Sequence, residues 1–206
     1  MEVRLEGISR KFNRQKVFQN LTYTFSSGET YAILGGNGSG KSTLIKVILG
    51  ALTPSKGSIS YSVQQKELSK DEAPYRIALA SPYLELVEEL TALEFLNFHL
   101  KFKAFISGLT PLSLLALAHL EDARDKQIRN FSSGMKQRLR LALALASDVD
   151  LILLDEPTSN LDPQGIQWFQ QLIKEYREER TLIVGSNFSE AETGFCKHQL
   201  ELKDYK

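Results

Sequence analysis

One nine-residue segment constrains this chain more than any other: residues 35–43 read GGNGSGKST. They match the pattern G-x-x-x-x-G-K-[ST] and lie between an expected strand at 30–34 and an expected helix at 41–52. Glycines let backbone N–H groups turn toward phosphate oxygens, and the helix N-terminus adds positive potential. The segment predicts a phosphate-binding loop in an α/β fold. A merely flexible glycine loop is the alternative, and the flanking strand and helix argue against it.

The side chains of this loop have distinct expected roles. The Lys41 ammonium can reach the β- and γ-phosphates of a nucleotide, and the Ser42 hydroxyl can ligate Mg²⁺. The residues expected to contact the nucleotide here are Gly35, Gly36, Asn37, Gly38, Ser39, Gly40, Lys41, Ser42 and Thr43.

Two adjacent carboxylates end an apolar run farther along the chain, in LILLDE at 151–156. A continuous apolar run is typical of a parallel strand buried on both faces. We expect Asp155 to hold Mg²⁺ through its water shell, and Glu156 to orient or deprotonate the water that attacks the nucleotide. In the alternative, both carboxylates face solvent in the turn before Pro157, but the upstream phosphate loop favours the catalytic interpretation.

The expected secondary structure changes twice along the chain. Strands are expected at 3–9, 21–27, 30–34 and 57–61, then a polar connector at 62–76. Residues 84–147 are mostly helical in pattern, with breaks at SGLTP and NFSSG, and are interpreted as an inserted helical subdomain. The α/β rhythm then returns, with a helix at 162–180 capped by Asp162, a strand at 181–187, and capping-box spacing between Ser189 and Glu192.

Composition excludes several classes of partner. The 25 Lys and Arg residues balance the 25 Asp and Glu residues, so no basic field favours nucleic acid. One cysteine excludes an intramolecular disulfide, and three histidines provide no zinc-site cluster. No signal-peptide core or membrane-spanning apolar window is visible, so we expect a soluble chain in a reducing compartment.

Two further segments, FSSGMKQR at 131–138 and LLDEPTSNLD at 153–162, join the phosphate loop in a combined pattern. Together they resemble the signature motif, Walker B motif and D-loop of ATP-binding cassette (ABC) ATPases. The resemblance covers essentially the whole chain. It implies one domain over 1–206: a P-loop NTPase core with a mostly parallel central sheet, an N-terminal antiparallel β subdomain and the helical subdomain at about 84–147.

The resemblance also implies a dimer, because in this family two nucleotide-binding domains face head to tail around ATP. Ser132, Ser133 and Gly134 would bind the γ-phosphate of a nucleotide on the partner, and either serine is also an ordinary helix N-cap. Asp162 would communicate across the dimer, a role compatible with capping. Phe12 stands where the family stacks an aromatic residue on adenine; the alternative is an aromatic ring packed under a hairpin.

Two positions depart from the family pattern. Ser81, Pro82 and Tyr83 stand where the family carries a glutamine that senses Mg²⁺, and a proline ring cannot donate a hydrogen bond. Asn187 follows Ser186 where the family has histidine. Its amide can still donate to the γ-phosphate but cannot shuttle a proton, and the alternative is a turn former at the end of a strand.

The resemblance implies an ATPase that drives a separate transmembrane permease subunit, with ATP and Mg²⁺ bound. Such a subunit is cytoplasmic and peripheral on the inner face of the cell membrane. The stretch LTALEFLNF is similar to small exporter-type subunits such as the haem exporter ATPase of cytochrome c maturation. The alternatives are a soluble ABC-type ATPase of an assembly system and a regulatory nucleotide-binding subunit with low turnover; Glu156 argues against the latter.

Overall fold

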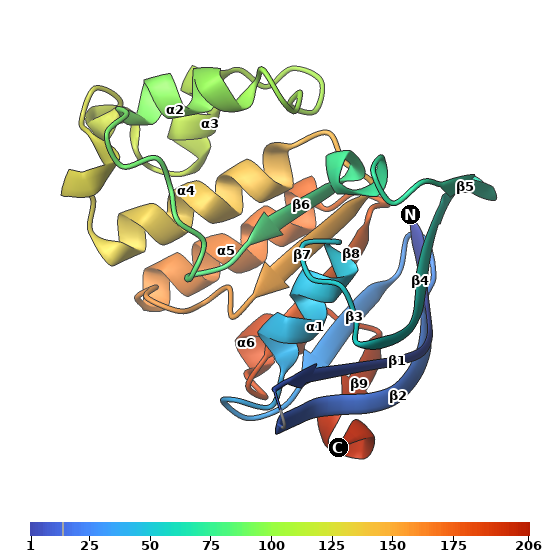
Figure 1. The fold of residues 1–206 in the computed structure, drawn as a ribbon. Helices are drawn as coiled ribbons and strands as arrows, with labels where there is room; N and C mark the ends of the chain where they lie inside the picture. The colour runs from blue at the N-terminus through green and yellow to red at the C-terminus, as the bar shows by residue number, and fades with distance from the viewer. Residues whose placement is uncertain (14) are drawn as a thin grey trace.

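The computed structural model, which describes residues 1–13 and 15–206, contains two β-sheets with helices packed on them (Figure 1). One sheet is antiparallel, with strand order β2-β1-β4-β5. Its strands are β1 (Glu2–Phe12), β2 (Gln15–Phe25), β4 (Lys56–Val63) and β5 (Lys66–Leu68). The predicted N-terminal antiparallel sheet is therefore confirmed.

The connector expected at 62–76 is only partly a connector. It contains β5 and a 3₁₀ turn, η1 (Ala73–Arg76). Strands β4 and β5 form a hairpin in which Val63 pairs with Lys66 across a two-residue turn. Gln64 and Gln65 adopt φ values of 49° and 66°. A two-residue hairpin turn requires positive φ at both positions, and the residues usually found there are Asn and Gly. Because glutamines occupy the turn, the sequence lacks the Asn-Gly signal that predicts a hairpin.

The second sheet is parallel and has strand order β6-β7-β8-β3-β9. Its strands are β3 (Thr30–Leu34), β6 (Ile77–Ala80), β7 (Leu151–Asp155), β8 (Thr181–Ser186) and β9 (His198–Glu201). Strands β7 and β8 are buried along their whole length, as their apolar runs predict. Strands β6 and β9 are four residues long and carry no periodic signal.

Helix α1 (Lys41–Ile48) lies between the two sheets, where Leu44 and Ile48 join one core with Leu153 of β7 (Figure 1). Neighbouring residues Ile152 and Leu154 point to the opposite face and pack with the helices there, because side chains alternate along a strand. Helix α1 is shorter than expected. It ends before Gly50, whose φ is 83°, so Ala51 is exposed rather than part of the apolar face.

Helices α4 (Ser133–Ala146) and α5 (Pro163–Tyr176) cover the opposite face of the parallel sheet (Figure 1). Helix α4 also packs against α2 (Ala92–His99) and α3 (Pro111–Leu117) in a separate apolar core. The range 84–147 is less helical than expected, because irregular segments and two short 3₁₀ turns separate these helices.

Within the described part of the chain, no helix combines the length and the apolar character needed to cross a bilayer.

Candidate functional site

The glycine-rich loop joins the carboxyl end of β3 to the start of α1, as its sequence predicts. Gly40 has φ 107°, and a Cβ atom there would lie 2.5 Å from Val17 Cγ1. A Cβ on Gly35 would lie 2.4 Å from Ser39 Oγ. A side chain at Gly35 would displace Ser39, and one at Gly40 would displace Val17 and strain the backbone at its positive φ, so the loop geometry depends on glycine. A Cβ on Gly36 or Gly38 would meet nothing within 4 Å, which leaves that side of the loop open for a phosphate group.

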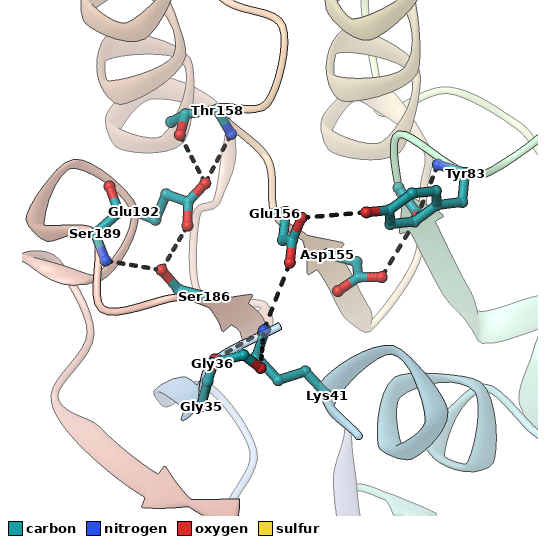
Figure 2. A network of polar contacts seen from close by, with 11 residues as sticks. Gly35, Gly36, Lys41, Tyr83, Asp155, Glu156, Thr158, Ser186, Ser189 and Glu192 are labelled. Carbon is teal, nitrogen blue, oxygen red and sulfur yellow. Dashed lines mark hydrogen bonds and ion pairs between the residues drawn. The ribbon is translucent and has the colours of Figure 1, made fainter. Parts of the chain in front are cut away.

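Lys41 lies at the first position of α1, and its side chain is buried against this loop (Figure 2). The ammonium donates hydrogen bonds to the carbonyl oxygens of Gly35 at 2.8 Å and Gly36 at 3.2 Å. Its Nζ also lies 3.5 Å from Glu156 Oε1. The arrangement holds a positive charge where the loop and the carboxylates of β7 meet.

Asp155 ends β7 and is 2% exposed. Burial raises the pKa of its carboxyl, while the hydroxyl groups of Ser42 and Ser81 act in the opposite direction. Ser81 donates to Oδ2 at 3.3 Å, whereas Oδ1 is buried with no hydrogen-bond partner among the described residues. An unpartnered buried carboxylate oxygen beside a serine hydroxyl fits the all-oxygen surroundings that Mg²⁺ prefers.

Glu156 follows at the turn and leaves the strand direction, with φ 46°. Its N–H donates to the carbonyl of Gly185 at 2.8 Å, which extends the β7–β8 pairing by one bond. One carboxylate oxygen faces Lys41, and the other accepts a hydrogen bond of 3.5 Å from the Tyr83 hydroxyl (Figure 2). The negative charge of Glu156 raises the pKa of Tyr83.

The segment that lacks the expected glutamine therefore supplies two other contacts. Ser81 reaches Asp155, and Tyr83 reaches Glu156, while Pro82 lies between them. In the sequence, the three residues stand out only as a departure from the family pattern. Short β6 carries no signal of its own, and only its pairing with β7 places this segment beside the two carboxylates.

A cleft of about 370 Å³ unites residues 37–43 of the loop with Glu156, Tyr83 and Phe12. Phe12 ends β1 and is 47% exposed, so it is not packed under the hairpin. The Arg10 guanidinium lies 4.5 Å from the centre of its ring. An exposed ring at one end of a cleft and a phosphate loop in the same cleft match the two ends of a nucleotide.

The residues of the signature-like segment are absent from the described lining of this cleft. Ser132 and Ser133 are exposed at the start of α4, and Ser132 Oγ accepts a hydrogen bond from Met135 N–H at 3.2 Å, which confirms the N-cap. Asp162 caps α5 in the same way, accepting from Gly165 N–H at 2.7 Å. A Cβ on Gly134 would lie 3.1 Å from the carbonyl oxygen of Asn160, so the two segments pack closely.

Asn187 is exposed just beyond β8, and among residues 1–13 and 15–206 its side chain makes no hydrogen bond. The capping box expected after it is wrong. Ser189 precedes α6 (Glu190–Thr193) without a side-chain cap. The Glu192 carboxylate instead points inward and accepts hydrogen bonds from Thr158 and Ser186 (Figure 2). A buried carboxylate needs hydrogen-bond donors, and these two residues provide them.

The parallel sheet, the glycine loop at the end of β3 and the carboxylates at the end of β7 define the class of P-loop nucleotide-binding proteins. The family model described as ABC transporter matches residues 18–159. The chain belongs to this family, as an ABC ATPase cassette that binds ATP.

Individual relatives agree with this membership. An uncharacterized ABC transporter ATP-binding protein, YybJ of Bacillus subtilis, is 31% identical over 95% of this chain and 90% of its own length. The Nod factor export ATP-binding protein I of Burkholderia lata is 32% identical; the match covers 92% of this chain but only 64% of that protein. A dimeric ATP-binding cassette in a post-hydrolysis state with ADP and Pi has a TM-score of 0.82 and 27% identity, over 98% of this chain and 94% of that one.

Proposed function

We propose that this chain is the ATP-hydrolysing subunit of a transporter, paired head to tail with a second cassette and coupled to a separate transmembrane permease. One observation carries the proposal. A single chain brings the phosphate loop and Glu156 into one cleft, whereas Ser132, Ser133 and Gly134 lie outside the described lining of that cleft. The cleft holds the parts that bind and hydrolyse a nucleotide, and a partner would complete it.

In this proposal the groups of the site have distinct tasks. The loop N–H groups and Lys41 bind the phosphates of ATP, and Phe12 stacks on the adenine. Ser42 and Asp155 would hold Mg²⁺, which would offset the negative charge of the phosphates. Glu156 accepts a proton from the attacking water, and Tyr83 and Lys41 contact its two oxygens on opposite sides.

The second cassette supplies what this cleft lacks. The N-terminus of α4, with its exposed serines, is an anion site suited to a γ-phosphate held on the partner. Asp162 lies on the segment that packs against Gly134, where it can transmit changes between the two sites. The similar cassette with ADP and Pi is itself dimeric, which supports this arrangement.

Family membership and a relative named as an export ATP-binding protein support the proposed permease partner. We place the chain on the cytoplasmic face of the cell membrane, where ATP is available, bound to that partner. The transported substrate is then chosen by the permease and not by this chain.

The test is purification of the full chain with and without any membrane protein that its neighbouring gene encodes. We expect Mg²⁺-dependent ATP hydrolysis and co-purification with a protein of several membrane spans. Hydrolysis by a stable complex that contains no membrane protein would support the assembly-type alternative. Absence of ATP binding would contradict the proposal itself.

Asn187 provides a second prediction. We propose that its amide donates to the γ-phosphate, since it directly follows β8, whose Gly185 carbonyl accepts the Glu156 N–H. The Asn187→His variant should hydrolyse ATP faster than the wild type, because imidazole reaches farther and can carry a proton. The Asn187→Ala variant should be slower, by about two- to tenfold for one lost hydrogen bond. Equal rates for alanine and asparagine would mean that this residue only terminates the strand.

A further inference from the structure

Glu192 joins two segments that flank the candidate catalytic group, and this contact was not anticipated from its sequence spacing. The side chain comes from α6 and is 4% exposed. Its Oε1 accepts hydrogen bonds from the backbone N–H of Thr158 at 2.9 Å and from the Thr158 hydroxyl at 2.7 Å. Its Oε2 accepts one from the Ser186 hydroxyl at 2.5 Å (Figure 2).

The two segments are the turn after β7 and the end of β8. Thr158 lies two residues after Glu156, and Ser186 immediately precedes Asn187. The ladder between β7 and β8 ends with the bond from Glu156 N–H to the carbonyl of Gly185. Beyond that bond, the Glu192 carboxylate forms the next link between the two segments.

Each contact in this group has a matching donor and acceptor. The Ser186 hydroxyl donates to Glu192 and accepts from Ser189 N–H at 3.2 Å, which closes the loop containing Asn187. On the other side of the turn, the Gln137 amide donates to the carbonyl of Pro157 at 2.9 Å. Glu156, with φ 46°, therefore lies between the end of β7 and a turn that is anchored on both sides.

We propose that Glu192 is a positioning residue for ATP hydrolysis: its carboxylate fixes the turn that carries Glu156 relative to the segment that carries Asn187. The inference rests on the proposed function, because it assigns Glu192 a role in that same site. It requires no contact between Glu192 and the nucleotide. A displacement of about 1 Å in a reacting group can reduce a rate about a hundredfold, so a buried link of this kind affects turnover directly.

The chemistry explains why a carboxylate occupies this position. An ionised carboxylate is acceptor-only, and it can take all three donors at once. A glutamine would keep its oxygen toward Thr158 and turn its NH₂ group toward Ser186. Because NH₂ is a donor, the Ser186 hydroxyl would have to accept from it and donate its own proton elsewhere. Glutamine therefore preserves most of the link, whereas alanine leaves two hydroxyl groups and one N–H without their acceptor.

The test compares kcat, KM for ATP and Tm of the purified full chain in four variants. Glu192→Ala should lower kcat by about ten- to a hundredfold with KM unchanged. Glu192→Gln should recover most of this loss, and Thr158→Val, which keeps the backbone N–H, should cause a smaller loss in the same direction. The matched control is Glu190→Ala, which removes an exposed carboxylate from the same helix and should leave kcat unchanged.

A double variant of Glu192 and Asn187 distinguishes a positioning role of Glu192 from a role in stability alone. If Glu192 acts by placing Asn187 and Glu156 together, the losses of Glu192→Ala and Asn187→Ala should combine less than multiplicatively. A role confined to folding predicts a lower Tm with normal kcat in the folded fraction.

Several results would overturn the inference. One is a kcat for Glu192→Ala equal to that of the Glu190→Ala control; another is a rise in KM without a fall in kcat. If the alanine variant does not fold, Thr158→Val decides, and a wild-type kcat in that variant would reject the role. A wild-type chain that does not hydrolyse ATP would instead contradict the proposed function, and this result is distinct from those above.

Discussion

We expect the Glu156→Gln variant to bind ATP as the wild type does and to lose steady-state hydrolysis, with kcat reduced about 100- to 10,000-fold. The glutamine side chain has nearly the same volume, so it retains its place between Lys41 and Tyr83, but an amide cannot accept the proton of the attacking water. Phosphate release under saturating ATP measures the rate, and calorimetry measures the binding.

The matched control is Glu190→Gln, which makes the same chemical change at an exposed position outside the described lining of the cleft. It should retain wild-type turnover and affinity. Unchanged turnover of Glu156→Gln in the complex with its partners would refute the role assigned to this carboxylate. Loss of ATP binding would show that Glu156 contributes to the ground state instead.

The second large effect concerns nucleotide affinity. We expect Lys41→Ala to weaken ATP binding by about 10- to 100-fold, because hydrogen bonds from a charged donor contribute about 1.5–3 kcal/mol. The ammonium is buried in the loop, where it donates to the carbonyl oxygens of Gly35 and Gly36. Calorimetric titration of the full chain with ATP and Mg²⁺ measures the change.

Two variants separate charge from packing. Lys41→Met keeps most of the aliphatic stem and should lose affinity nearly as severely as alanine, since the missing group is the ammonium. Lys46→Ala removes an exposed lysine from the same helix and should bind ATP normally. Normal affinity of Lys41→Ala would count against the assignment of the phosphate loop.

Long apolar runs were the most predictable parts of the fold. The buried strands β7 and β8 follow their sequence patterns closely, and α5 begins at Pro163 as predicted but ends at Tyr176, before the expected end at 180. The short elements were not predictable. Strands β6 and β9 contain four residues each and are stabilised by pairing with neighbours that are distant in sequence. Helix α1 ended early because a glycine adopted a positive φ that local periodicity does not encode.

The candidate site also contains a part that the sequence predicted and a part that it did not. The phosphate loop and the carboxylates at 155–156 were predictable, because their chemistry requires particular residue types at fixed spacing on one strand–loop–helix unit. The contacts of Ser81 and Tyr83 with those carboxylates were not, since they depend on the pairing of β6 with β7. The spacing of Glu192 predicted a capping contact with Ser189, but in the fold its carboxylate binds Thr158, which is distant in sequence, and Ser186.

By itself, the sequence determined the class of fold, the phosphate loop and the pair of carboxylates, because each depends on side chains close together along the chain. Only the tertiary structure decided which hydroxyl groups contact the carboxylates and which buried acid links the turn after β7 to the end of β8. The physical reason is that a buried polar group must find a partner wherever the fold provides one. Sequence spacing describes only the local candidates.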